Sequence, residues 1–311
     1  MTNLNSQHTI DGASTDPVTR HLMQTRERLM QSDASFYLGD PAKAFTGKVV
    51  WKRIGRGNRL VTTESAAAVD AAQQAEAAAD TNSADSADIA SPTDTDPILE
   101  AAVLSAIVVI DFDDCWLTPC GHWKGPNKVT KKFEDLKMSF QGKAPTKDFL
   151  AQDFSSAVNN AKILMYEVAL GGAKSNGFLT VSRIAADALR FRHVVFEELT
   201  KSTDNGSDTA SDDDSWTMSN WPVIHSEAEL ISPNRCNAAL AGATVRVTFT
   251  LNHWFIDNAS KDQSPATNCF VADVQSIRVL INPTSQAMSP KKRKTARRDP
   301  ADESPKKRNN R

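Results

Sequence analysis

Two segments near the end of the chain alternate apolar and polar residues with a period of two. In residues 243–256 the apolar positions run from Val245 to Leu251, and a polar residue separates each from the next. Residues 269–281 alternate in the same way, with a change of phase at Gln275–Ser276 that is typical of a β-bulge. A period of two predicts strands that bury one face. Because a polar loop joins the two segments, they predict a β-hairpin.

Elsewhere the pattern is shorter and less regular. Residues 101–110 form an apolar run rich in β-branched residues, which predicts a buried strand and is too short to span a bilayer. Gly55 and Gly57 mark a turn that follows a first strand. The other predicted elements are that strand at 47–51, a helix at 146–160, a hairpin of 161–170 with 178–184, and a strand at 189–199.

These segments predict roughly six to eight strands and few helices, which is typical of an all-β architecture. We therefore expect a mainly β fold with one or two short helices. The variable loop lengths and the closing hairpin favour an antiparallel barrel like the oligonucleotide-binding (OB) barrel. A β-sandwich of another topology is the alternative that the pattern leaves open.

Composition separates an ordered body from segments that lack core-forming residues. Residues 1–33 are polar and predict a disordered N-terminal arm, in which only residues 21–30 could form a short helix. The β-rich domain covers residues 34–287. Acidic insertions at 64–97 and 201–215 interrupt it, and their lack of large apolar residues predicts disorder, although the Ala-rich first half of the former could form a frayed helix.

The net charge of −2 conceals a strong segregation of charge. Residues 288–311 contain ten basic residues against three acidic ones, and we expect a disordered basic tail there. Two Ser-Pro units each precede a basic cluster, and closely spaced cations on an extended chain are typical of nuclear-import signals. A tail that contacts DNA non-specifically and a merely solubilising end are the alternatives. The predicted importin-binding residues are Lys291, Lys292, Arg293, Lys294, Lys306, Lys307 and Arg308, and the predicted phosphorylation sites are Ser289 and Ser304.

Basic and aromatic residues interleave in two stretches of the body. Proteins that bind single-stranded nucleic acid combine cations, which follow the phosphates, with exposed rings on which bases stack. The alternative is that the tryptophans anchor the core and the lysines are ordinary solvated residues. The candidate nucleic-acid-binding residues are Lys48, Trp51, Lys52, Arg53, Arg56 and Arg59 in the first stretch, and Trp123, Lys124, Lys128, Lys131 and Lys132 in the second.

The closing hairpin adds a resemblance to known proteins. The segments "GATVRVTFTLNHWFI" and "CFVADVQSIRVL", within residues 242–280, are similar to the terminal hairpin of OB-like, single-stranded nucleic-acid-binding proteins and of uncharacterised fungal proteins. The resemblance implies an OB-like fold and binding of single strands. It includes no stacking motif that can be placed on particular residues.

Other chemistries have weaker support. Cys115, Cys120 and His122 lack the second ligand pair of a structural zinc site, and the four cysteines do not suggest a disulfide framework. Asp111, Asp113 and Asp114 end an apolar strand, where nucleases keep metal ligands, but no second acidic cluster matches them. No secretory signal is visible at the N-terminus. We expect no catalytic residue, metal, cofactor, small-molecule substrate or membrane partner.

The sequence therefore predicts a non-enzymatic nuclear protein that binds nucleic acid, with single-stranded DNA or RNA favoured, and is imported through its basic tail. The alternative is a nuclear protein-interaction module that contacts basic partners through its acidic segments.

Overall fold

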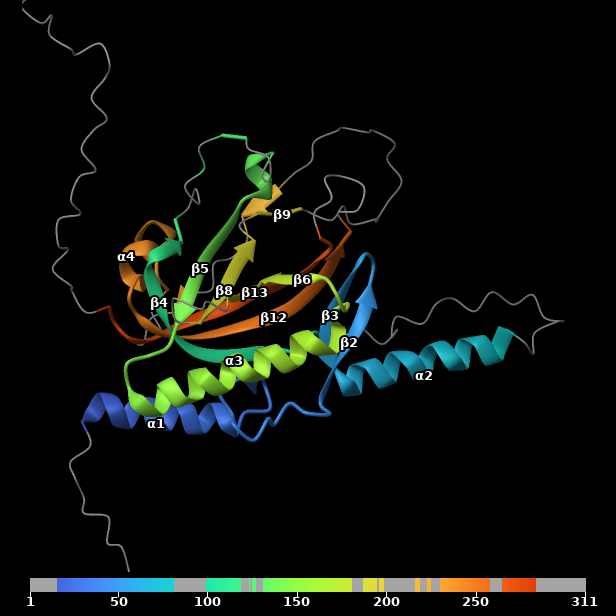
Figure 1. The fold of residues 1–311 in the computed structure, drawn as a ribbon, viewed down its shortest axis with the longest axis horizontal. Coiled ribbons are helices and arrows are strands. Elements are labelled where there is room, and N and C mark those ends of the chain that lie inside the picture. Colours follow the sequence, from blue (N-terminus) through green and yellow to red (C-terminus); the bar gives the residue numbers. More distant parts are fainter. Residues whose placement is uncertain are drawn as a thin grey trace, which may run out of the picture.

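The computed structural model describes residues 16–80, 99–118, 123, 125–126, 131–180, 187–194, 196–198, 216–218, 223–224, 230–257 and 265–283. Its centre is a closed ring of five strands, shown in Figure 1. Around the ring β4 pairs with β5, β5 with β8, β8 with β13, β13 with β12, and β12 again with β4. The pairing of β8 with β13 is parallel and the other four pairings are antiparallel. The ring strands are β4 (Leu104–Trp116), β5 (Lys137–Lys143), β8 (Ala188–Val194), β12 (Thr244–Ile256) and β13 (Thr267–Ile281).

Shorter strands extend the ring into an 11-stranded sheet, and β9 with β10 forms a separate two-stranded sheet. A β2–β3 hairpin joins the ring where β3 pairs with β12. A sandwich would consist of two separate packed sheets, whereas these five strands form one continuous ring. The strands added to the ring are β1 (Phe36–Tyr37), β2 (Val49–Ile54), β3 (Gly57–Thr62), β6 (Lys174–Gly177), β7 (Leu179–Thr180) and β11 (Val223–Ile224). The separate sheet consists of β9 (Phe196–Glu198) and β10 (Trp216–Met218).

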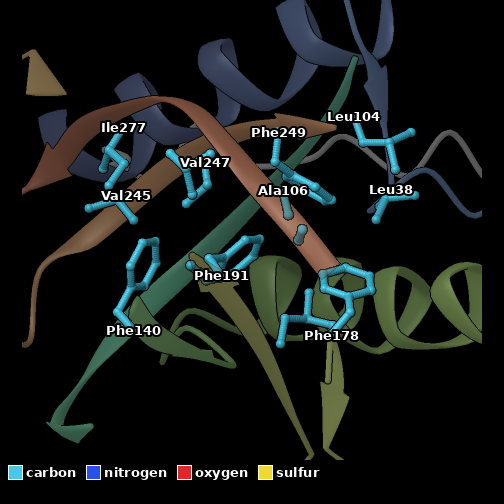
Figure 2. Close-up of a cluster of buried hydrophobic side chains, with 14 of the residues drawn as sticks. Leu38, Leu104, Ala106, Phe140, Phe178, Phe191, Val245, Val247, Phe249 and Ile277 are labelled. Atoms are coloured by element: carbon cyan, nitrogen blue, oxygen red, sulfur yellow. The ribbon is translucent and has the colours of Figure 1, made fainter. Parts of the chain in front are cut away.

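The β12–β13 hairpin confirms the prediction from alternation. Residues 245, 247, 249 and 251 of β12 point into the core, as Figure 2 shows for the first three. Thr248 pairs with Ser276 and Phe249 with Val274, so Gln275 is the extra residue of a bulge at the predicted change of phase.

Aromatic side chains fill the inside of the ring (Figure 2). Phe191 stacks on Phe140 with ring centroids 5.1 Å apart and meets Phe249 edge-on at 5.1 Å. Phe178 lies 5.4 Å from Phe249. These rings come from three ring strands and from the segment before β7, so burial of their apolar surface holds the strands together. Such burial contributes roughly 1.5–3 kcal/mol per large side chain.

The helices show that the fold is mixed α/β, and the prediction of one or two short helices was wrong. Three of the four α-helices among the described residues are 14, 18 and 21 residues long. They are α1 (Pro17–Met30), α2 (Thr63–Asp80) and α3 (Asp148–Val168), followed by the short α4 (Cys236–Leu240). Short 3₁₀ turns lie at η1 (Phe133–Asp135) and η2 (Pro233–Arg235). None of the helices in the described ranges is long and apolar enough to cross a membrane.

Helix α1 corrects the prediction of a disordered arm over residues 1–33. Asp16 caps its first turn, and hydrogen bonds from the Thr19 hydroxyl and the Val18 N–H lower the pKa of this carboxyl to about 2. Leu22 and Leu29 lie seven residues apart on one face and are buried. This face is only two large residues wide in an otherwise polar segment, and for that reason the composition suggested an unpacked arm. Residues 1–15 lie outside the described residues.

Helix α3 packs its apolar face against the hydrophobic core of the ring and lies beside α1 (Figure 1). It continues to Val168, so the predicted strand at 161–170 and its hairpin were wrong. Ala157, Ala161, Leu164 and Met165 are buried at helical spacing. Apolar runs of this length fit both a buried strand and a buried helix, and packing against the ring decides between them.

Helix α2 corrects the first part of the insertion predicted to be disordered at 64–97. Alanine has the highest helix propensity, which favours a helix even without a wide apolar face. Ala66 is buried, and Lys52 of β2 forms an ion pair with Asp70 at 2.7 Å, so the first half of the helix is attached to the hairpin. The helix then projects away from the ring (Figure 1). The rest of this insertion and the whole of 201–215 lie outside the described residues.

Candidate nucleic-acid interface

Alternation places charged and polar side chains on the outside of the ring. In β8, Leu189 and Phe191 are fully buried, while Arg190 is exposed and Arg192 half-buried. In β12 the residues that follow the core positions, Arg246, Thr248 and Thr250, are half-buried in the same way, whereas Asn252, in the next such position, is buried. Because a strand turns successive side chains to opposite faces, one outer face collects these residues from neighbouring strands.

Four of these side chains form a hydrogen-bonded ladder across four strands. Arg192 of β8 donates to Asp273 of β13 through Nε at 2.6 Å and Nη2 at 3.3 Å. Asn252 Nδ2 of β12 donates to Asp273 Oδ2 at 2.8 Å, and Arg59 Nε of β3 donates to Asn252 Oδ1 at 3.1 Å. We call Arg192, Asp273, Asn252 and Arg59 the polar ladder. It fixes the orientation of two guanidinium groups, and the acceptor of Arg59 in the ladder is a neutral amide oxygen and not a carboxylate.

Trp254 lies next to the polar ladder. The Arg192 guanidinium carbon is 5.6 Å from the centroid of its ring, within the range of a cation–π interaction. A side chain on Gly57 would come within 2.7 Å of the indole nitrogen, so the glycine leaves the space that the indole occupies. Trp254 is half-buried, and the contacts with Arg192 and Gly57 restrict the position of its indole, which could stack on a base with the surface that stays exposed.

Lys137 adds a cation at the β5 edge of this face. Partial desolvation and the positive charge of Arg192 lower the pKa of the Lys137 ammonium group. The carboxylates of Asp273 and Asp135 oppose this shift only in part, and Lys137 is exposed, so its ammonium group can contact a ligand from solvent.

The structure divides the first predicted stretch into separate roles. Trp51 is a core anchor: its indole donates to the Leu164 carbonyl at 2.9 Å and packs on the core. Lys52 is paired with Asp70, and Arg59 belongs to the polar ladder. Lys48, Arg53 and Arg56 are exposed around the β2–β3 hairpin, with Arg56 in its turn.

The second predicted stretch lies in the connection between β4 and β5. Trp123 and Phe133 meet edge-on with centroids 6.0 Å apart, and Lys131 and Lys132 are exposed beside them. The described part of the stretch therefore contains an aromatic pair with two cations just before the start of β5. Lys124 and Lys128 lie outside the described residues, as do Ser289, Ser304 and all seven predicted import residues.

The acidic end of β4 pairs with cations of neighbouring strands. Lys143 of β5 contacts Asp111 at 2.6 Å, and Arg190 of β8 contacts Asp114 at 2.8 Å. The Trp116 indole also donates to Asp114. Within the described ranges no group of three His, Cys, Asp or Glu side chains is arranged to hold a metal ion. The described part therefore gives no support to a nuclease centre at Asp111, Asp113 and Asp114.

The cysteines of the described part are free thiols. Burial raises the pKa of Cys115 to about 11, which keeps it protonated at neutral pH. Cys120 and His122, the other members of the zinc alternative, lie outside the described residues.

Sequence reasoning missed Arg190, Arg192, Asp273, Asn252 and Trp254. The sequence pattern that could have identified them is the alternation itself, because in "LRFRHV" and "LNHWF" each core residue is followed by a residue of the opposite face. Which strands lie side by side could not be read from the alternation, so the ladder was not visible in the sequence.

Comparison with known proteins gives a distant structural likeness to one class, the single-stranded DNA-binding proteins of bacteriophages. The structure is similar to gp2.5 of bacteriophage T7, at 11% identity and a TM-score of 0.37, over 60% of this chain and 96% of that protein. It is also similar to the single-stranded DNA-binding protein of bacteriophage Enc34, at 10% identity and a TM-score of 0.35, over 78% of this chain and 95% of that one. The Enc34 protein in complex with single-stranded DNA matches at 12% identity and a TM-score of 0.32, over 75% of this chain and 94% of that one. At these values the likeness assigns no function. No protein family and no curated protein matches the sequence.

Proposed function

We propose that this protein binds single-stranded nucleic acid on the outer face of β8, β13, β12 and β3. The observation on which the proposal rests is the polar ladder with Trp254 beside it. Two oriented guanidinium groups and an accessible indole on one strand face provide the two contacts that a single strand needs, one for phosphates and one for a base. We interpret the ring accordingly as an OB-like barrel, whose strand face binds oligonucleotides.

The charges on this face define its contacts further. Asp273 compensates Arg192, so Arg192 serves mainly to hold Trp254 and the ladder in place. Arg59, with a neutral partner in the ladder, and Lys137, which is exposed, are left to contact phosphates. Arg53 and Arg56 at the hairpin extend the cationic surface beyond β3.

Fluorescence anisotropy of the full chain with a labelled oligo(dT) tests the proposal. Binding should weaken as salt rises, because each released phosphate counterion contributes a slope of about −0.7 in log K against log salt for single strands. Replacement of Trp254 by Ala should cost about 1–3 kcal/mol of binding free energy, and Trp254→Phe should retain most of it. Arg59→Gln should weaken binding and reduce the salt slope.

Lys162 on α3 provides the matched control, because its weak ion pair with Asp187 lies on a helix and not on the strand face. Lys162→Gln removes the same charge as Arg59→Gln and should leave binding unchanged. Equal losses in the two variants, or no salt-dependent binding by the full chain, would show that this face is not the binding site.

We also propose that the protein acts in the nucleus and is not an enzyme. The support for a nuclear location is the doubled basic cluster at 291–294 and 306–308, which lies outside the described residues. The protein-interaction alternative rests on the acidic segments 64–97 and 201–215, of which only residues 64–80 are described. It stays a prediction, which recovery of basic protein partners after nuclease treatment would favour.

A further inference from the structure

Arg246 of β12 and Arg278 of β13 are directly opposite each other in the strand register. Like charges in this position destabilise a strand pair. Neither side chain has an ion pair or a hydrogen bond among the described residues, and Arg246 Nε is buried without a partner. Desolvation and the charge of Arg278 both lower the pKa of Arg246. The pair therefore lacks a negative partner within the described part of the protein.

The next outward pair along the same strands consists of two hydroxyl residues. Thr248 is opposite Ser276, and their hydroxyl groups are hydrogen-bonded to each other. Two guanidinium groups and two hydroxyl groups thus lie on adjacent rungs of one hairpin. We call Arg246, Arg278, Thr248 and Ser276 the arginine–hydroxyl patch.

We propose that the arginine–hydroxyl patch binds a phosphate group. Guanidinium groups match phosphate oxygens in bidentate geometry, and hydroxyl groups donate to the same oxygens. A bound phosphate would supply the missing negative charge between the arginines and a partner for Arg246 Nε. A carboxylate-rich peptide would supply charge as well, but a carboxylate presents two oxygen acceptors in one plane, whereas a phosphate presents a tetrahedral set that can accept from both strands.

The position of the patch indicates where that phosphate comes from. Arg246, Thr248, Thr250, Asn252 and Trp254 occupy the outward positions of β12. Along this strand Thr248 therefore lies about 14 Å, and Arg246 about 20 Å, from Asn252 of the polar ladder, at ~3.4 Å per residue. A single strand that crosses the ladder and follows β12 would reach it. This source of the phosphate rests on the proposed function, whereas the phosphate chemistry of the patch does not.

The test is Arg278→Glu in the full chain, which replaces the cross-strand repulsion by an attraction. The melting temperature should rise by about 1–3 °C, so a loss of binding cannot be attributed to a loss of folding. Affinity for a 30-nucleotide oligo(dT) should fall about tenfold, with the salt slope reduced by about 0.7–1.4. Affinity for a short oligo(dT) of about 4 nucleotides, the lower end of OB-fold site sizes, should change less than twofold.

Thermal melts with inorganic tripolyphosphate test the phosphate site independently of the proposed binding of single strands. Tripolyphosphate should raise the melting temperature of the unmodified protein more than that of the Arg278→Glu variant. If oligo(dT) does not bind at all but this difference is found, the phosphate site stands and the proposed function fails. Arg235→Glu, at an exposed arginine of η2, is the control for charge alone. Equal behaviour of the Arg278→Glu and Arg235→Glu variants in both assays would overturn the inference.

Discussion

Arg26 on α1 and Asp153 on α3 form a two-point ion pair, with Nε–Oδ2 at 2.6 Å and Nη2–Oδ1 at 2.9 Å. Asp153 is buried, and Tyr37 of β1 donates to the same carboxylate at 2.9 Å. Burial and the neighbouring Asp153 charge raise the pKa of Tyr37, so its hydroxyl remains a donor at every physiological pH. Two neighbouring N-terminal elements, α1 and β1, thus meet a helix more than a hundred residues away at this one carboxylate. The segment 17–30 is therefore part of the folded body.

Asp153→Ala should lower the free energy of unfolding by about 2–3 kcal/mol, because it leaves Arg26 and Tyr37 without their shared acceptor. The expected loss is modest for a buried pair because the Arg26 side chain retains 32% exposure and can be partly hydrated. Urea unfolding of the full chain measures the change. Asp33→Ala, at an exposed aspartate, should cost less than about 0.5 kcal/mol. Equal losses of unfolding free energy in the two variants would mean that the ion pair does not hold α1 on the folded body.

Stability should fall on acidification through His253, whose pKa is lowered by burial. The Asn268 amide exchanges two hydrogen bonds with the Leu170 backbone, which fixes its oxygen as the acceptor for His253 Nε2–H. His253 Nδ1 is then left to accept from the Asn58 amide, and protonation would destroy this bond.

A histidine pKa that is lower in the folded than in the unfolded state means that the unfolded chain takes up the proton first. The contribution of His253 to the free energy of unfolding is therefore complete above pH ~6.5. It is lost as the pH falls below that value, by at most about 1.4 kcal/mol per pH unit. Urea unfolding from pH 8 to pH 5 should show this slope, and His253→Gln should flatten it. The same slope in the variant would assign the effect to another group.

Gly177→Ala should destabilise the protein by about 2–4 kcal/mol. Gly177 has φ +101°, and a β-carbon there would lie 2.1 Å from the Phe270 carbonyl oxygen. Gly171 has no positive φ, and a β-carbon added to it would meet no atom within 4 Å, so Gly171→Ala is the matched control. Thermal melts of the two variants should differ clearly, and a similar melting temperature would show that β6 can move away from β13.

Deletion of residues 288–311 should leave the melting temperature unchanged and abolish nuclear accumulation of a large reporter fusion. Replacement of residues 291–294 by Ala should have the greater effect, since four consecutive cations form the denser cluster. Replacement of residues 306–308 should have the smaller one. A tail-deleted fusion that still concentrates in nuclei would favour the solubilising role of the tail.

The sequence predicted those elements whose pattern is decided locally. The β12–β13 hairpin and its bulge at Gln275 follow from alternation alone, and the buried strand at 101–110 from its β-branched run. Helix α1 was missed because its packing depends on Asp153, more than a hundred residues away. In the same way Arg59 was predicted as a candidate, whereas Arg192 was not, because only strand order brings the two into one ladder.

The pairing of β4 with β12 joins residues 104–109 to residues 244–249. During synthesis β4 emerges long before its partner, so the ring stays open and β4 keeps a bare edge until β12 has been made. Closing so long a loop is slow, and bare edges invite pairing between chains. Chains shortened within β12 should therefore aggregate during folding, whereas those shortened after Pro283 should not.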